Sequence, residues 1–467
     1  MVKIVSVETL RHIETAADAA GFPLDLMMEN AGTAVARRVV DILKQLPDPA
    51  DSRVTVLVGN GKNGGDGLVA ARVLAQNSPA QVRAYLIAKR PDDDPLLQAA
   101  REAHVFVADA EDDQRFRVLT NMIASANVVV DALFGIGVQL PLRDDAAKLL
   151  RAARAAINGS EHEDENLEGE LIDPTDPTTA AKRTRPYVLA VDCPSGLNCD
   201  TGEIDKNTLE ADETVTFIAV KPGLLAFPGA QAVGKLTAAT LGIPDNTEGL
   251  KDAKRFLVDA TYARDLLPSR TSASHKGSYG KALIVGGSIN YTGAPGMSAL
   301  AAYRSGTGLV TVGTPAPVAA ILASRLFEPT WTLLPSDMGV IASSAAPMVR
   351  AEAAKVDALL IGPGINREKT TKEMMLDLFH SKAKAAKGAI GFVSVKGSEA
   401  PKEEAPLPPL ALDADALNLL SEIDDWWTLL PPQTIITPHA GEFGRLAKLE
   451  REEVEKNLLR AAAVLLE

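Results

Sequence analysis

Residues 54–67, with the sequence VTVLVGNGKNGGDG, decide the fold of this chain. The apolar run 54–58 predicts a strand, and the residues that follow, 68–74, predict a helix. A glycine-rich turn between a strand and a helix lets backbone N–H groups and the helix N-terminus approach an anion closely. The stretch therefore predicts an α/β sheet whose first turn holds a phosphorylated ligand, and we expect that ligand to be a nucleotide.

The glycine pattern is weak evidence when it is taken alone. Gly59, Gly61 and Gly64 satisfy the pattern G-x-G-x-x-G, which a glycine-rich turn without a ligand can also satisfy. The stretch is not a Walker A loop, because no Ser or Thr stands in the required place after a Gly-Lys pair. Asn63 and Asp66 are polar side chains that such a turn does not need. We expect them to coordinate a cation or to hydrogen-bond the polar head of a ligand.

The composition narrows the class of protein. At 467 residues the chain is long enough for two or three domains, and its 46% hydrophobic content suits an α/β protein. The net charge of −13 argues against nucleic-acid binding, which needs a basic face. No apolar stretch is long enough to span a bilayer, and the N-terminus lacks the apolar run of a signal peptide. We therefore expect a cytoplasmic protein whose partner is a small molecule rather than a nucleic acid or a membrane. A homo-oligomer is compatible with these features.

The two cysteines, Cys193 and Cys199, are too few to form a zinc site by themselves. Their separation allows a disulfide, but free thiols in a reducing compartment are the state we expect.

Two helices are expected before the glycine-rich stretch, over residues 8–19 and from Leu24 through Val39. The second contains Met28-Glu29-Asn30-Ala31-Gly32, in which Asn and Gly are poor residues for a helix interior. Close packing and a ligand contact would both explain them, and the sequence leaves both explanations open.

Two acidic residues stand at the ends of apolar strands. Residues 126–131 predict a strand that ends at Asp131, and residues 186–192 predict another that ends at Asp192. Further strands are expected over 81–87, 214–220 and 235–241. In doubly wound sheets, ligands bind at the carboxyl ends of the strands. One such Asp is more often a helix cap or a turn former, but two of them beside a glycine turn favour a ligand site.

The second half of the chain repeats this pattern after a polar stretch near residues 244–254. Strands over 281–285, 309–312 and 358–361 adjoin glycine turns, and a helix is expected over 297–304. Later strands lead to Asp413 and to His439, which lies between Pro and Gly at a place where a ligand can bind. Residues 158–185 are acidic and then rich in Pro and Thr, so we expect them to form a solvated surface insertion.

The last residues predict an amphipathic helix, with Val454, Leu458, Leu459 and Ala462 on one face. The sequence stops at Glu467 without a residue type that ends helices. Since a parallel sheet would normally continue, we expect an incomplete domain.

Taken together, the motifs resemble those of the bifunctional NAD(P)H-hydrate repair enzymes, which fuse an NAD(P)H-hydrate epimerase to an ADP- or ATP-dependent NAD(P)H-hydrate dehydratase. The resemblance covers nearly the whole chain apart from residues 158–185. It implies a Rossmann-like, doubly wound epimerase domain over 1–248, followed by an incomplete ribokinase-like α/β dehydratase domain over 249–467. The motifs that carry it are MENAG at 28–32, NGGDG at 63–67, DCPSGL at 192–197, HKG at 275–277, GGS at 286–288, and TPH at 437–439 with Gly441-Glu442.

For the first half, the resemblance implies a site for the hydrated dinucleotide, a potassium ion and an acid/base residue. The potassium ligands would be Asn63, Asp131 and Ser195, and Asp192 would contact the substrate and exchange protons with it. Two departures from the family pattern are Lys62, where the family commonly has Asn, and the loosely matching residues 138–140. The implied substrate-binding residues are Lys62, Asn63, Gly64, Gly65, Asp66, Gly135, Ile136, Gly137, Val138, Gln139, Leu140 and Pro141.

For the second half, the resemblance implies a reaction in which ADP or ATP, with Mg²⁺, phosphorylates the hydroxyl of the hydrate before phosphate is eliminated to restore NAD(P)H. The matching substrate-binding residues are Ala294, Gly362, Gly364 and His439. In the family, a nucleotide-binding Lys-Gly segment and a Gly-Ser/Thr-Gly-Asp motif follow the position of His439, and this sequence ends before either. We therefore expect the chain as given to be a poor or inactive dehydratase.

Two other functions were weighed against a repair enzyme. A non-catalytic, regulatory protein could hold a dinucleotide in the same turn without turnover. A Rossmann oxidoreductase would need an acid at the end of the second strand to bind a ribose, but the sequence has Ala88-Lys89-Arg90 there. The oxidoreductase ranks last, because it leaves Asp131 and Asp192 unexplained.

Overall fold

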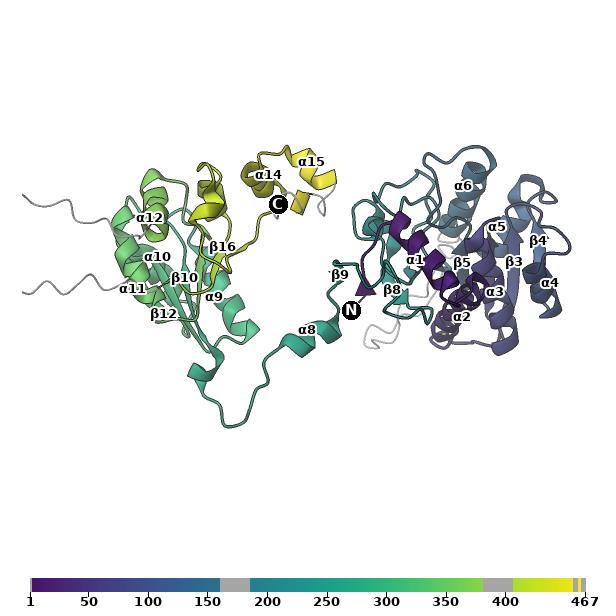
Figure 1. Ribbon diagram of the computed structural model, residues 1–467, viewed down its shortest axis with the longest axis horizontal. Helices are drawn as coiled ribbons and strands as arrows, with labels where there is room; N and C mark the ends of the chain where they lie inside the picture. Colours follow the sequence, from purple (N-terminus) through teal and green to yellow (C-terminus); the bar gives the residue numbers. More distant parts are fainter. Residues whose placement is uncertain (1, 160–184, 381–405, 457–460, 463–467) are drawn as a thin grey trace, which may run out of the picture. The chain divides into compact units, whose positions relative to one another are not determined.

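The computed structural model describes residues 2–159, 185–380, 406–456 and 461–462. By its internal contacts the chain divides into two compact units, Met1–Leu267 and Pro268–Glu467. Each unit is built from a parallel sheet with helices, as expected of an α/β protein (Figure 1). Nearly all of the insertion expected over 158–185 lies outside the described residues.

The first unit contains, among its described residues, a seven-stranded parallel sheet with the order β4-β3-β2-β5-β6-β7-β8. The chain enters at β2, moves to the β4 edge, and then returns to β5 on the other side of β2. This reversal between β2 and β5 makes the sheet doubly wound, and it creates a crevice at the carboxyl ends of the strands. The strands are β2 (Arg53–Val58), β3 (Gln81–Leu86), β4 (Phe106–Asp109), β5 (Val128–Ala132), β6 (Tyr187–Val191), β7 (Glu213–Phe217) and β8 (Lys235–Ala239).

Helices cover this sheet, and two of them pack closely next to the glycine-rich stretch. Asn30 donates to the carbonyl of Leu241 at 2.8 Å, and a Cβ at Gly32 would lie 2.5 Å from the Cβ of Val69. Packing thus explains Asn30 and Gly32. The helices are α1 (Val7–Ala19), α2 (Leu24–Leu43), α3 (Lys62–Asn77), α4 (Pro95–Glu102), α5 (Arg117–Ala124), α6 (Asp144–Gly159), α7 (Gly229–Val233) and α8 (Ala260–Leu266).

The structure corrects three sequence expectations in the first unit. Helix α3 begins at Lys62, inside the glycine-rich stretch, rather than at residue 68. Strand β7 ends at Phe217 instead of residue 220, because Ile218 adopts a left-handed backbone with φ +64°. Strand β4 was not expected, since it lies at the edge of the sheet and its apolar run is short and partly exposed. The N-terminal strand β1 (Val2–Lys3) pairs with β9 (Phe256–Leu257).

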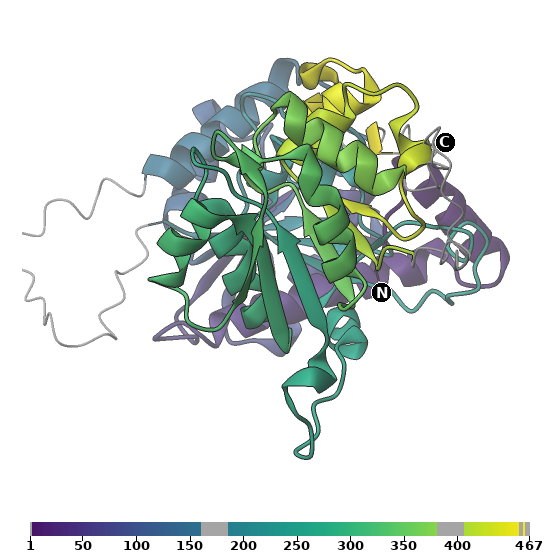
Figure 2. The ribbon, with the colours of Figure 1, turned by 90° about the vertical axis from the view of Figure 1, so that its left-hand side faces the viewer.

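The second unit contains, in the part that the structure describes, a six-stranded parallel sheet with the order β12-β11-β10-β15-β16-β17 (Figure 2). The partly exposed edge strand β12 and the small β13–β14 hairpin were not expected. The strands are β10 (Lys281–Val285), β11 (Leu309–Pro315), β12 (Thr330–Leu334), β13 (Ser336–Asp337), β14 (Val340–Ile341), β15 (Ala358–Ile361), β16 (Leu410–Leu412) and β17 (Ile435–Ile436).

Helices accompany these strands in the alternating pattern that parallel connections require. The helix expected over 297–304 is confirmed within α9. The expected C-terminal helix is described up to Lys456, and Leu458 and Leu459 lie outside the described residues. The helices are α9 (Gly293–Ser305), α10 (Ala316–Ala323), α11 (Ala346–Ala353), α12 (Lys369–Phe379), α13 (Asp415–Leu420), α14 (Ala440–Ala447) and α15 (Arg451–Lys456).

The core is aliphatic in both units. Every residue of β5 is buried, as expected of a central parallel strand covered on both faces. Cys193 and Cys199 are buried free thiols. Among the described residues, no helix is long and apolar enough to cross a bilayer.

A buried ion pair joins α2 to the sheet. Glu213 in β7 has no exposed side-chain surface, and it accepts two hydrogen bonds of 2.8 Å from the guanidinium of Arg38. Thr237 and Tyr187 donate to the same carboxylate at 2.8 and 3.1 Å. Burial raises the pKa of Glu213, but the hydrogen bonds and charge of Arg38, together with the hydrogen bonds from Thr237 and Tyr187, outweigh it. The pKa therefore lies below its ordinary value.

We predict that Arg38→Met lowers the free energy of unfolding by about 3 kcal/mol at pH 7, because it leaves Glu213 buried and unpaired. The loss should shrink as the pH falls. The stability that a lowered carboxyl pKa contributes is complete above the unfolded value of about 4.3 and is lost as the pH falls from there through the folded value. Urea unfolding at pH 7 and pH 4 measures both effects.

Lys44→Met is the control, because Lys44 belongs to the exposed pair with Asp41 and should cost less than about 0.5 kcal/mol. If Arg38→Met lowers the free energy of unfolding equally at both pH values, the loss does not come from leaving the charge of Glu213 unpaired.

Candidate functional site

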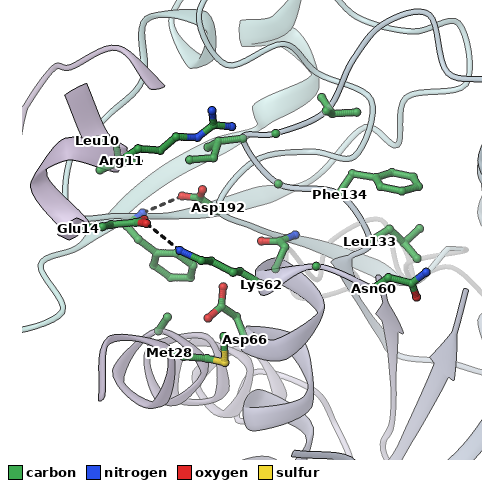
Figure 3. A pocket seen from close by; sticks show the side chains of 18 of the residues that line it. Leu10, Arg11, Glu14, Met28, Asn60, Lys62, Asp66, Leu133, Phe134 and Asp192 are labelled. Atoms are coloured by element: carbon green, nitrogen blue, oxygen red, sulfur yellow. Dashed lines mark hydrogen bonds and ion pairs between the residues drawn. The ribbon is translucent and has the colours of Figure 1, made fainter. Parts of the chain in front are cut away.

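A cavity of about 970 Å³ opens in the first unit at the carboxyl ends of the central strands (Figure 3). Its walls come from α1, α2, the start of α3, the turns after β3 and β5, and the segments after β6 and β7. The lining residues include Leu10, Arg11, Glu14, Met27, Met28, Asn60, Lys62, Asn63, Asp66, Ala88, Phe134, Gly135, Ile136, Gly137, Val138, Asp192, Phe217 and Ile218.

The two turns that meet at the cavity approach each other more closely than side chains would allow. A Cβ at Gly59 would lie 1.8 Å from the carbonyl oxygen of Leu133, and a Cβ at Gly64 would lie 1.8 Å from that of Gly59. Glycine at both positions thus joins the turn after β2 to the turn after β5 and to the first turn of α3.

The N-terminus of α3 points its free N–H groups toward the cavity region. Its N-cap, Gly61, provides no side-chain hydrogen bond, so the first N–H groups of the helix keep donor capacity for a ligand. Gly61 and Lys62 line the cavity at this helix end. A phosphate group suits this place, because the helix dipole and the free N–H groups both favour an anion.

Several charged side chains lie close together in the lining of the cavity. Lys62 pairs with Glu14 of α1 at 3.3 Å, and Figure 3 shows Lys62 extending past Asp66 and Asp192 toward Glu14. Burial raises the pKa of Asp66 well above its ordinary value, and the negative charges of Asp192 and Glu14 raise it further. The positive charges of Lys62 and Lys221 oppose this shift of the Asp66 pKa. The raised pKa favours the protonated form of Asp66, whereas Asp192 lies against a cation, Lys221.

Hydrogen bonds between Asp131 and Ser195 join the turns after β5 and β6 next to the cavity. The backbone N–H of Ser195 donates to Oδ2 of Asp131 at 2.8 Å, and its hydroxyl donates to Oδ1 at 2.5 Å. The N–H of Phe134 donates to the same hydroxyl oxygen at 3.0 Å. Burial raises the pKa of Asp131 to about 6, although the hydrogen bonds from Ser195 and Leu133 oppose the shift.

The cavity gathers eight of the residues that the sequence assigns to the first site. Gly64 and Gly65 are buried in α3 and, like Gln139, Leu140 and Pro141, are not among its lining residues. Asp131 and Ser195 are buried below. The eight that line it are Lys62, Asn63, Asp66, Gly135, Ile136, Gly137, Val138 and Asp192.

Sequence reasoning missed the contribution of α1 and of the segment after β7. Arg11 and Glu14 lie one turn apart on α1 and line the cavity, but their spacing is that of any amphipathic helix. Phe217 and Ile218 were read as strand residues. The sequence did not single out Lys221, because a Lys that follows a strand carries no signal that it is buried.

In the second unit, the structure brings two of the four predicted residues together. A Cβ at Gly364 would lie 3.2 Å from the Cβ of Ala294, and one at Gly362 would lie 1.8 Å from the carbonyl oxygen of Asp413. His439 caps α14 and accepts from the N–H groups of Gly441 and Glu442. A smaller cavity of about 520 Å³ does not have the four residues in its lining; it is lined by Ile289, Asn290, Asp337, Met338, Val340, Asn366, Glu368, Lys369, Thr370 and Glu373.

Comparison with known proteins gives a consistent result for both units. Residues 24–223 match the family model described as YjeF-related protein N-terminus, and residues 282–467 match the model described as NAD(P)H-hydrate dehydratase. The bifunctional NAD(P)H-hydrate repair enzyme Nnr of Moorella thermoacetica is 32% identical over 94% of this chain and 74% of its own length. The protein of the same name from Salinibacter ruber is 34% identical over 91% of this chain and 72% of its own.

Among solved structures, the ADP/ATP-dependent NAD(P)H-hydrate dehydratase from Bacillus subtilis, co-crystallised with ATP and Mg²⁺, is 26% identical. The match covers 43% of this chain and 59% of that one, with a TM-score of 0.30.

We predict that Gly64→Ala lowers the free energy of unfolding by at least about 2 kcal/mol, because the new Cβ would collide with the carbonyl of Gly59. Gly61→Ala is the matched control, since nothing lies within 4 Å of its added Cβ and its φ is −89°. Thermal unfolding of the two variants measures the difference. Equal melting temperatures would contradict the tight approach of the two turns.

Proposed function

Because this chain belongs to the family of bifunctional NAD(P)H-hydrate repair enzymes, we propose that its first unit interconverts the R and S epimers of NAD(P)HX. The observation that supports this most is one cavity containing a helix N-terminus suited to phosphate and two carboxyl groups, Asp66 and Asp192. The apolar residues Leu10, Met27 and Phe134 give the nicotinamide ring a surface to lie on. On this proposal the ligand is a small molecule and the enzyme acts in the cytoplasm.

The two carboxyl groups suit an acid–base reaction because their electrostatic surroundings differ. Inverting a carbon that carries a hydroxyl group needs a proton to be taken at one point and supplied at another, with no net change. Asp192 lies beside the ammonium of Lys221. Burial and the negative charges of Asp192 and Glu14 raise the pKa of Asp66, which favours its protonated form. We assign the base role to Asp192 and the acid role to Asp66.

The residues beneath the cavity fit a potassium ion. Asp131 is a buried carboxylate whose protein hydrogen bonds come from the neutral donors Ser195 and Leu133. The buried Nδ2 of Asn63 has no hydrogen-bond acceptor among the described residues, and turning the amide over would present its oxygen instead. Hard cations prefer such oxygen ligands. We propose that Asn63, Asp131 and Ser195 hold K⁺, which orients oxygen atoms of the substrate when it is bound.

The second unit is proposed to dehydrate (S)-NAD(P)HX with ADP or ATP and Mg²⁺, as the family name and the Bacillus subtilis relative suggest. Ala294, Gly362, Gly364 and His439 are its proposed substrate contacts. The expectation that the chain as given is a weak dehydratase stays a prediction.

That prediction is tested by adding ADP or ATP with Mg²⁺ to the protein and (S)-NADHX and following the absorbance of NADH. Little or no nucleotide-dependent NADH is expected. Recovery of NADH at a rate comparable to that of a full-length relative such as the Moorella enzyme would contradict it.

For the first unit, we predict that Asp192→Asn lowers the rate of epimerisation by about 10²- to 10⁴-fold, since the amide cannot accept the proton. Chromatography that separates the R and S epimers of NADHX measures the rate. Asp245→Asn, at an exposed residue away from the cavity, is the control and should match the unmodified protein.

An epimerisation rate that Asp192→Asn leaves unchanged would exclude Asp192 from the chemistry. If the unmodified protein binds NADHX without converting it, the alternative function, a non-catalytic dinucleotide-binding or regulatory protein, replaces the epimerase.

A further inference from the structure

Lys221 is a fully buried cation whose ammonium group lies on Asp192. Its side chain has no exposed surface. The Nζ atom donates to Oδ1 of Asp192, to the hydroxyl of Thr216 at 2.8 Å, and to the carbonyl of Phe217 at 3.4 Å. An ammonium group is costly to bury unless it is paired and hydrogen-bonded. These contacts therefore fix Asp192 and Lys221 relative to each other and to the end of β7.

The two oxygens of the Asp192 carboxylate have different surroundings. Oδ1 accepts from Lys221, from the N–H of Phe217 at 3.1 Å and from the hydroxyl of Thr216 at 3.2 Å. In the part of the chain that the structure describes, Oδ2 accepts no hydrogen bond from the protein. Asp192 lines the cavity, where Figure 3 shows its carboxyl group. With Oδ1 covered by three donors, Oδ2 is the oxygen left for a ligand.

The backbone on both sides of this contact is strained. Asp192, just after β6, has φ +65°, and Ile218, just after β7, has φ +64°. A left-handed conformation is costly for any residue other than glycine, and it is rarest for a β-branched one such as Ile. Such strain persists where the surrounding structure enforces it, and it gathers at functional sites. Here both strained residues line the same cavity, and Lys221 connects the two segments.

We propose that Lys221 is a positioning residue for the epimerisation proposed above, on which this inference rests. With Thr216 and the N–H of Phe217, it holds Oδ1 of Asp192 so that only Oδ2 exchanges protons with the substrate. Oδ2 takes the proton that leaves the substrate, and Asp66 supplies the proton that the substrate gains, so the substrate undergoes no net change in protonation. Transfer of a proton from Asp192 to Asp66 restores both carboxyl groups. Lys221 takes no part in the proton transfer, and the step needs no oxidant, reductant or further reactant.

The other charged groups near Asp192 are not placed to hold its Oδ1 atom. Asp66, Lys62 and Glu14 lie on the cavity side, from α1 and α3. Lys62 is mostly exposed and is paired with Glu14 at 3.3 Å. Lys221 approaches Asp192 from the opposite, buried side and is not among the residues that line the cavity. Its hydrogen bonds therefore act on the substrate through Asp192, while its charge also lowers the pKa of Asp66.

A purely structural ion pair would behave differently. Replacing one partner of a buried pair destabilises a protein whether or not the pair has a function. Such a role would change the melting temperature and the folded fraction but not the turnover of the folded molecules. A positioning role lowers kcat of the folded enzyme and leaves KM nearly unchanged, because Lys221 does not contact the substrate.

The test compares Lys221→Met, Lys221→Arg and Lys235→Met by their kcat and KM for epimerisation of NADHX. Lys235 is exposed at the start of β8 and controls for the loss of a positive charge. We expect Lys221→Met to lower kcat by roughly 100-fold with KM within about twofold, in the range known for groups that orient a reacting residue. Lys221→Arg should recover at least about tenfold of that loss, and Lys235→Met should match the unmodified protein.

A Lys221→Met variant that turns over at the unmodified rate, or that changes KM instead of kcat, would overturn the proposal. If this variant does not fold, Thr216→Val decides, since it removes the hydroxyl shared by Lys221 and Asp192 and keeps the side-chain shape. A drop in kcat of about five- to tenfold at constant KM supports the proposal, and an unchanged kcat overturns it. The proposed epimerase function fails separately, if the unmodified protein leaves the epimer ratio unchanged.

Discussion

The close approach of two backbone turns is the constraint on which the site depends. Gly59 and Gly64 let the turn after β2, the turn after β5 and the first turn of α3 meet at distances that exclude any Cβ. Because the chain reverses direction between β2 and β5, the segments that follow this contact diverge and leave a crevice at the carboxyl ends of the strands. The hydrogen bonds between Asp131 and Ser195 hold the turn after β6 against the end of β5. The cavity thus follows from strand order and from glycine at two positions.

The charges around this cavity place two carboxyl groups, Asp192 and Asp66, in different electrostatic surroundings. Asp192 is held by a cation on its buried side, whereas Asp66 has burial and neighbouring negative charges around it. Placing like groups in unlike surroundings is a general means of providing an acid and a base at one pH. The left-handed residues Asp192 and Ile218 show that the fold accepts strain at this point. The geometry is therefore more specific than stability alone would require.

Much of this arrangement follows from local sequence. Apolar runs marked the central strands, and residues at strand ends, such as Asp131 and Asp192, marked the edge of the sheet where the cavity lies. The sequence did not predict the edge strands β4 and β12, because the apolar run of β4 is short and Thr residues interrupt that of β12. The sequence also did not predict that α1 lines the cavity or that Lys221 is buried, because both features depend on contacts between segments far apart in the chain. A sequence shows that a residue is charged, but not that another element covers it.

The most direct test of the account is the conversion of purified (R)-NADHX by the unmodified protein, followed by chromatography of the two epimers in potassium chloride and in choline chloride. The account predicts that the S epimer appears in potassium and that its rate falls when choline replaces potassium. An R epimer that persists unchanged in both salts, while binding to the protein is demonstrated, would contradict the assignment of the cavity as an active site.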